Sequence, residues 1–276
     1  MSKTSTGSSF DISAYDYFSG VSKEDMLCKL LHAYQEIAPA ILDNPMDTDG
    51  DLLEVLSGGM LSAFTVTLIC IYLAATAVVS WPSTWVDFAM GLPINLKWGA
   101  LECEDDSASQ NGLAIVGCQF PRTIILPVSD RAASHFYLWY ILAAKQGNYY
   151  VLNTRLVDSL SGGQTRQVFL ERCALIIPTV QHLFPGFHLE VQPDFGYYPG
   201  FHQGLGNNHC GFYVARATSA ALFNQLPSLE HQMSFHVVQL RMAEILEKCR
   251  GGDLEMMLRG AAPDPNFLSL HDLPER

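Results

Sequence analysis

One cysteine of this chain stands where a thiol can act as a nucleophile. Cys210 follows the polar residues Asn207, Asn208 and His209 and begins the apolar run Gly211-Phe212-Tyr213-Val214-Ala215. This pattern predicts a helix that begins at the cysteine. The partial positive charge at the N-terminus of a helix stabilises a thiolate. Cys210 is therefore the predicted nucleophile.

A cysteine nucleophile needs a base for its proton and a third group that orients the base. His135 begins a run typical of a strand, and Asn153 closes the next such run, residues 149–152. If these strands form a hairpin, the start of one lies beside the end of the other, so His135 and Asn153 should meet. The side-chain carbonyl of Asn153 can orient an imidazole ring. Asp158 is the fallback orienting group, and the Gln203 amide can donate to an oxyanion.

The order of these residues resembles that of the cysteine peptidases that process ubiquitin-like proteins, the deSUMOylase group. In that family a histidine begins a strand, an acidic residue ends the next strand, and a glutamine shortly precedes the Asp-Cys-Gly that opens a helix. The matching residues here are His135, Asn153, Gln203 and Cys210-Gly211. The resemblance covers roughly residues 51–226. It implies a papain-like α+β fold with a central antiparallel sheet and a Cys-His-Asn triad that uses no metal and no cofactor.

The chain departs from the family pattern at several positions. Phe136 replaces the usual tryptophan, Asn153 the acidic residue, and His209 the aspartate before the cysteine. The gap between Gln203 and Cys210 is one residue longer. The predicted function is thiol hydrolysis of peptide or isopeptide bonds. An acyltransferase that uses the same cysteine and histidine, and a catalytically inactive binding module, remain open alternatives.

The overall charge bears on the partners. The formal net charge is -12, from 28 acidic and 16 basic residues. A strong negative charge disfavours binding to phosphate backbones and to anionic membranes, so nucleic acid is not expected as a partner. The resemblance implies a ubiquitin-like protein or its conjugates as the partner. The sequence carries no signal for the oligomeric state.

Hydrophobic periodicity and turn residues predict the elements that must position these side chains. The acidic stretch 44–51 predicts a turn, and Gln146-Gly147-Asn148 predicts a hairpin turn. Helices are expected at residues 22–37, 60–79, 165–176, 210–226 and 229–249, and strands at 113–118, 123–128, 135–142, 149–152 and 188–191.

One expected helix is apolar enough to raise the question of a membrane span. Residues 60–79 carry no charge and are long enough to cross a bilayer. No lysine or arginine occurs between Lys29 and Lys97, so positive anchors are missing on both sides, and threonines dilute the apolar run. This pattern favours a buried core helix, and membrane contact is not expected.

Cysteine usage and length suggest the compartment and the organisation. Seven cysteines lie far apart, without zinc-ligand spacing and in an odd number, which suits a reducing compartment. The start of the chain shows no apolar signal segment, so the cytoplasm or the nucleus is expected. Residues 1–50 are expected to form an extension with a disordered start and one helix. The catalytic domain is expected at 51–250 and a tail at 251–276.

Overall fold

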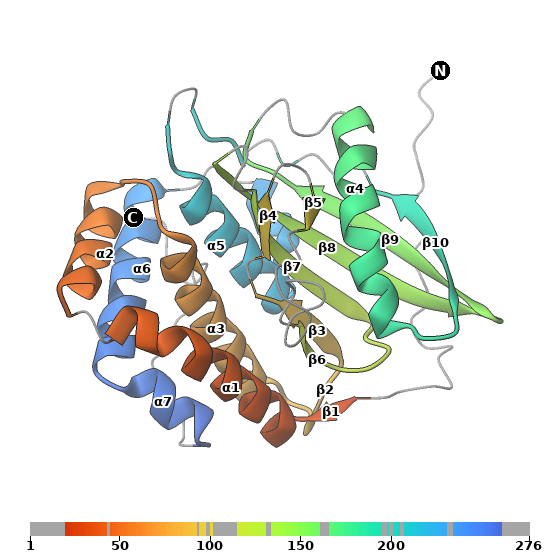
Figure 1. Cartoon of the computed structure of the whole chain (residues 1–276), viewed down its shortest axis with the longest axis horizontal. Coiled ribbons are helices and arrows are strands. Elements are labelled where there is room, and N and C mark those ends of the chain that lie inside the picture. The colour runs from red at the N-terminus through yellow and green to blue at the C-terminus, as the bar shows by residue number, and fades with distance from the viewer. Residues whose placement is uncertain are drawn as a thin grey trace.

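The protein is built around a mixed β-sheet with helices on both faces (Figure 1). The computed structural model describes residues 20–42, 45–92, 94–97, 100–101, 115–130, 134–160, 166–194, 198, 201–204, 207–230 and 234–260. One buried cluster joins one face of the sheet to most of the helices, and a second lies between the other face and α4 (Arg166–Val180). This arrangement confirms the α+β class.

The remaining elements follow in chain order. The other helices are α1 (Lys23–Leu42), α2 (Pro45–Ser57), α3 (Ala63–Ser80), α5 (Cys210–Leu222), α6 (Phe235–Arg250), α7 (Asp253–Leu258) and the short 3-10 turns η2 (Gln181–Leu183) and η3 (Leu226–Glu230). The strands are β1 (Val21–Ser22), β2 (Trp85–Val86), β3 (Phe88–Gly91), β4 (Ile94–Lys97), β5 (Ala100–Leu101), β6 (Ile115–Gly117), β7 (Thr123–Asp130), β8 (His135–Gln146), β9 (Tyr149–Val157) and β10 (His188–Pro193).

The sheet is mixed rather than antiparallel throughout. Its main path runs β10-β9-β8-β7-β3-β6. The central strands β7, β8 and β9 pair antiparallel, as expected, whereas β10 pairs parallel with β9, and both β3 and β4 pair parallel with β7. The physical reason is the connection: α4 carries the chain back along the sheet before β10 begins, and a helical crossover places the next strand parallel.

Strand β8 lies at the centre of this sheet and is covered on both faces. Leu138 belongs to the cluster on the α5 side, whereas Tyr137 and Trp139 belong to the cluster under α4. A strand buried on both sides needs apolar residues at successive positions, which explains the almost continuous apolar run of β8. The strand therefore offers its first residue, His135, a rigid support.

The hairpin between β8 and β9 forms where the sequence predicts it. Gln146 pairs with Tyr149 across the turn, and Gly147 adopts a positive φ of 60°. Glycine reaches this conformation without the steric cost that a side chain would bring. The turn sets the register of every pair along β8 and β9.

The apolar helix α3 is a core helix in this structure. Every residue from Thr65 to Val78 is buried, and Ser62 caps the start by accepting from the Thr65 backbone N–H. The hydroxyls of Thr67 and Thr76 donate to the carbonyls of Ala63 and Tyr72, so these buried polar groups are satisfied. By length and composition α3 passes the test for a membrane span, a test that core helices of soluble proteins also pass.

Elements of the two predicted extensions share the main core. Met26 and Leu30 of α1, and Leu254 of α7, are fully buried in the same cluster as α3 and α5. The turn expected at residues 44–51 is wrong: α2 runs through it, with Pro45 at the first helical position that proline tolerates. The domain boundaries at 50 and 250 stay predictions. The expected disordered start and the last part of the tail lie outside the described residues.

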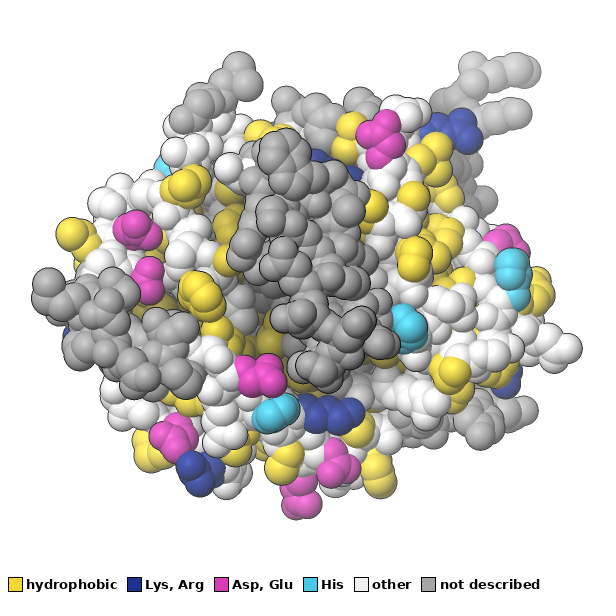
Figure 2. Space-filling view, viewed as in Figure 1, with side chains coloured by type: hydrophobic (Ala, Val, Ile, Leu, Met, Phe, Trp, Pro, Cys, Tyr) yellow, Lys and Arg dark blue, Asp and Glu magenta, His cyan; other side chains and the backbone are white. Residues whose placement is uncertain are grey.

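Charged side chains are dispersed over the face shown in Figure 2, where described acidic, basic and hydrophobic groups intermix. Several of the basic groups on α6 and α7 pair with acids on the same helix, as Arg250 does with Glu247 and Arg259 with Glu255. The described residues on this face therefore form no concentrated basic surface.

Candidate active site

Cys210 is the first residue of α5, as the sequence predicts, and is 4% exposed. The helix lies between α3 and the sheet (Figure 1). Gly211 allows this close approach, because a Cβ atom there would lie 3.0 Å from Cβ of Leu61, in the segment that precedes α3. The cysteine is thus held by a buried helix start rather than by a free loop.

His135 is the first residue of β8, and its imidazole is buried. Its Nε2 atom lies 2.7 Å from Oδ1 of Asp158. The side chain of Cys210 also acts on the ring, because its hydrogen-bonding and its charge raise the pKa of His135. The histidine therefore joins the thiol to a buried carboxylate.

Asp158 follows the last residue of β9 and is fully buried. Besides His135, its Oδ1 accepts from the Leu160 backbone N–H at 2.9 Å, and its Oδ2 accepts from Nη1 of Arg172 at 2.5 Å. Burial alone would raise the pKa of this carboxyl, but the hydrogen bond and charge of His135 outweigh it and leave the pKa lowered. Asp158 is thus a carboxylate held in one orientation.

The same contacts act on His135. Burial would lower its pKa, but hydrogen bonds to Asp158 and Cys210, together with their charges, raise it to about 9. The ring is therefore protonated at neutral pH. A histidine that holds a proton between a carboxylate and a sulfur is the arrangement that activates a cysteine nucleophile.

This electrostatic arrangement can be measured without substrate. We expect the His135 ring, followed by NMR in histidine-labelled protein, to titrate with a midpoint near pH 9. Asp158→Asn should move the midpoint down, because the carboxylate that favours the imidazolium is gone. Since the folded pKa exceeds the unfolded one, the stabilisation from this proton is complete below about pH 6.5 and lost as the pH rises through 9. An unshifted midpoint near 6.5 would contradict the geometry.

Asn153 does not lie beside His135. It occupies the middle of β9 and pairs with Leu142, seven residues along β8 from His135, or about 24 Å at about 3.4 Å per residue. The expected strand 149–152 is too short, because β9 continues to Val157. If the register of the turn pair Gln146 and Tyr149 is continued along both strands, residue 160 comes to lie opposite His135. Asp158 is much closer to that position in the sequence than Asn153 is, so the position of the predicted turn favours Asp158.

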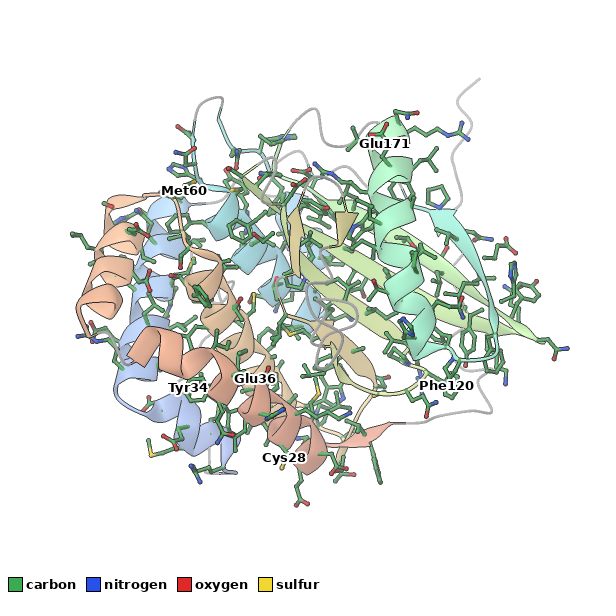
Figure 3. The ribbon with its side chains drawn as sticks, viewed as in Figure 1. Cys28, Tyr34, Glu36, Met60, Phe120 and Glu171 are labelled. Carbon is green, nitrogen blue, oxygen red and sulfur yellow. The ribbon has the colours of Figure 1, made fainter. Side chains whose placement is uncertain are left out.

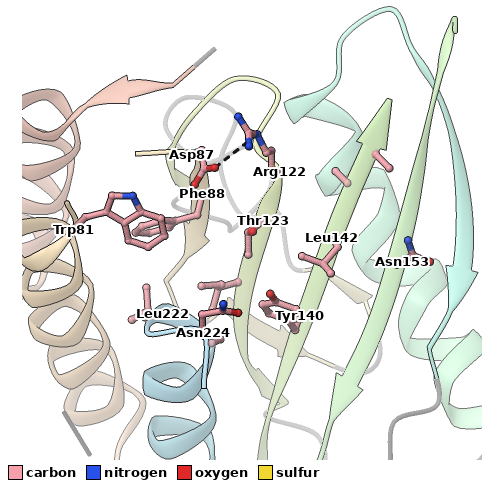
Figure 4. Close-up of a pocket in the computed structure, with 14 residues that line it drawn as sticks. Trp81, Asp87, Phe88, Arg122, Thr123, Tyr140, Leu142, Asn153, Leu222 and Asn224 are labelled. Carbon is pink, nitrogen blue, oxygen red and sulfur yellow. Dashed lines mark ion pairs between the residues drawn. The ribbon is translucent and has the colours of Figure 1, made fainter. Parts of the chain in front are cut away.

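The side chain of Asn153 instead lines a pocket of about 360 Å³ at the far end of α5 (Figure 4). Leu222 and Asn224 contribute from the end of that helix and Tyr140 from β8. None of the other predicted site residues lines this pocket. This pocket and Cys210 thus lie at opposite ends of α5.

Gln203 lies beside the strand end that carries Asp158. Its backbone N–H donates to the Ser159 carbonyl and its side-chain Oε1 accepts from the Ser159 hydroxyl, each at 3.0 Å. Its Nε2 donates to the carbonyl of Asn207 at 3.2 Å, three residues before Cys210. These bonds hold the amide between the Asp158 segment and the loop that leads to the cysteine.

His209, the departure next to the cysteine, faces α6. Its ring stacks on Phe235 with 3.9 Å between centroids and 20° between planes. Burial lowers its pKa, against a hydrogen bond to the Gly58 backbone that acts the other way. The residue therefore anchors the start of α5 to neighbouring elements and stands apart from the pair formed by His135 and Asp158.

Cys210 begins α5 and His135 begins β8, as the sequence predicts, and Gln203 lies in the loop before Cys210. The sequence pattern favoured Asn153 over Asp158 and gave no signal for the contact of Arg172 with Asp158. Within the described residues, no group of three or more histidine, cysteine or acidic side chains is placed to hold a metal ion. No protein-family model matches the chain, and the comparison with curated proteins found no match.

A solved structure of a de-sumoylating protease is similar to this chain with a TM-score of 0.39 and 9% sequence identity. The similarity covers 76% of this chain and 83% of that chain. A similarity of this size carries no argument about function. The chemistry of the site must be argued from its own residues.

Proposed function

We propose that the protein is a thiol hydrolase of peptide or isopeptide bonds with Cys210, His135 and Asp158 as its triad. The observation that carries this proposal is the buried His135 ring, which lies 2.7 Å from the Asp158 carboxylate and whose pKa is raised by Asp158 and by Cys210, a cysteine at a helix start. This replaces Asn153 by Asp158 as the orienting group. A carboxylate stabilises an imidazolium better than an uncharged amide does.

In the proposed reaction, the Cys210 thiolate attacks the substrate carbonyl carbon and forms a tetrahedral oxyanion. The backbone N–H of Cys210 and the side-chain amide of Gln203 are the proposed donors to that oxyanion. The oxyanion collapses, the C–N bond breaks, and His135 donates its proton to the departing amine. Water then attacks the thioester and gives one proton to His135, and the C–S bond breaks. This step releases the acid and restores the Cys210 thiolate and the protonated His135 with which the reaction began. Asp158 keeps the ring oriented through both steps.

The proposed substrate is a ubiquitin-like protein or a conjugate that carries one, within a papain-like fold. The motif order described above supports this choice. Exposed apolar side chains on the segment that packs against Gly211 also fit a polypeptide. Leu61 packs against Gly211, and Met60 (Figure 3) and Phe64, which are close to Leu61 in the sequence, are 55% and 51% exposed. The proposed location stays the cytoplasm or the nucleus, on the sequence argument alone.

The geometry of the site gives the alternative of an inactive binding module less support than the sequence did. That alternative depended on an uncharged third member and on His209, but Asp158 supplies the charge and His209 stacks on α6. Acyl transfer shares every step up to the thioester. Acyl transfer differs from hydrolysis only in the group that accepts the acyl chain, which is an amine or a hydroxyl in place of water.

A panel of ubiquitin-like proteins with a C-terminal electrophile tests the proposal. We expect at least one member to form a covalent adduct with the wild type, none with Cys210→Ala, and undiminished labelling with Cys28→Ala. Cys28 is the matched control, because it is exposed on α1 (Figure 3). Labelling of Cys210→Ala at the wild-type rate, or no labelling of folded wild type by any member, would refute the proposal. Product analysis with an added amine separates hydrolysis from transfer.

A further inference from the structure

Arg172 reaches the site from the opposite side of the sheet. It belongs to α4, whereas Cys210 belongs to α5, on the other face. Its Nη1 lies 2.5 Å from Oδ2 of Asp158, whose other oxygen lies 2.7 Å from Nε2 of His135. We propose that Arg172 is a positioning residue that fixes the plane of the Asp158 carboxylate and thereby the His135 ring. This inference rests on the proposed function for its kinetic part only.

Because Asp158 is buried, its contact with Arg172 is important. The carboxylate has no exposed surface, and the Arg172 side chain is 16% exposed. A buried ion needs a partner of opposite charge and hydrogen bonds to each of its atoms. His135 and the Leu160 N–H occupy Oδ1, and Arg172 occupies Oδ2. Without the guanidinium, Oδ2 would lose this charged partner. The contacts of Oδ1 with His135 and with the Leu160 N–H would remain, but the plane of the carboxylate would no longer be fixed.

The guanidinium is itself held in place. Its Cζ lies 4.1 Å from the centre of the Tyr137 ring, a cation–π contact. Tyr137 is two residues after His135 on β8, so the two side chains lie on the same face of the strand, with ring centroids 6.3 Å apart. Phe169 of α4 packs edge-on against Trp139 at 5.1 Å and secures the helix on the sheet. The packing of α4 therefore sets the position of the carboxylate.

Arg172 and Asp158 should act on His135 with opposite signs. The charged or titratable groups around the His135 ring come from every element packed against it. Asp130 on β7 is the register partner of His135. The others are Cys210 of α5, Asp158 after β9, Arg172 of α4 and Tyr137 on β8. The anion of Asp158 favours the imidazolium, and the cation behind it partly cancels that effect. Removing Arg172 should raise the His135 pKa, whereas removing the Asp158 charge should lower it.

If Arg172 only tied α4 to the sheet, its loss would lower the stability of the protein without lowering kcat. The test compares Arg172→Met, Arg172→Lys and Arg166→Met. Arg166 is the control because it is an exposed arginine on the same helix. Each variant is followed by urea unfolding, by the NMR titration of His135, and by kcat and KM on the ubiquitin-like substrate that the probe panel identifies.

For Arg172→Met we expect an upward shift of the His135 midpoint and a fall in kcat of about 10- to 100-fold with KM unchanged. Arg172→Lys should restore most of kcat because it keeps the charge, and Arg166→Met should match the wild type. An unmoved midpoint in Arg172→Met, or in Arg172→Gln if the methionine variant does not fold, would overturn the inference. The NMR result stands even if no substrate is found, so it separates this inference from the proposed function.

Discussion

Asp158→Asn is expected to lower kcat/KM by about 1,000- to 10,000-fold, whereas Asn153→Ala leaves it within about twofold of the wild type. Asparagine keeps the size of the side chain but loses the charge that stabilises the imidazolium. Its amide nitrogen can also face His135 and favour the wrong tautomer. The measurement is steady-state hydrolysis of a fluorogenic ubiquitin-like substrate. The two variants test directly which residue orients the histidine.

Folding must be checked for both variants, because Asp158 is buried between His135 and Arg172. Circular dichroism and urea unfolding provide this control, and the rate comparison applies to protein that remains folded. Equal losses in the two variants would argue against a triad that contains Asp158. A large loss in Asn153→Ala alone would support the assignment made from the sequence.

Phe212→Ala is expected to lower the free energy of unfolding by about 3 to 5 kcal/mol. Phe212 lies in the first turn of α5 and is completely buried. Its ring packs against Phe235 of α6, with 4.9 Å between centroids, and against His209 at 6.0 Å. Truncation therefore leaves a cavity beside the residue that precedes Cys210. Urea unfolding followed by far-ultraviolet circular dichroism measures the change.

The matched control is Phe64→Ala, on α3. Phe64 is 51% exposed, so its truncation should cost less than about 1 kcal/mol. A cost at Phe212 as small as that at Phe64 would mean that the start of α5 is not packed as described. If the Phe212 variant cannot be purified folded, Phe212→Leu gives the same ranking with a smaller cavity.

The sequence predicted the features that depend on local pattern. A polar segment before an apolar run indicated the start of α5 at Cys210, and the run after His135 indicated β8. The turn at Gly147 is likewise local, since glycine reaches a positive φ cheaply. The apolar run of α3 is hydrophobic on all sides instead of on one face, which is the pattern of a fully buried helix.

The identity of the residue that lies beside His135 depended on the register between β8 and β9, which the local sequence pattern does not show. The polar residues Asn153, Thr154 and Arg155 look like the end of a strand, yet the pairing of β9 with β8 continues to Val157. A strand continues through polar residues when its neighbours supply hydrogen bonds and one face stays partly exposed. The intrinsic preference of such residues for turns is weak by comparison.

By itself the sequence determined the candidates for the chemistry and their local settings: a cysteine at a helix start, a histidine at a strand start, and a glutamine in the loop before the cysteine. Only the tertiary structure decided which carboxylate meets the histidine and that Arg172 supports it from α4. The reason is physical. Helix and strand signals come from neighbours along the chain, whereas the contact of Arg172 with Asp158 exists only once α4 has packed across the face of the sheet opposite to α5.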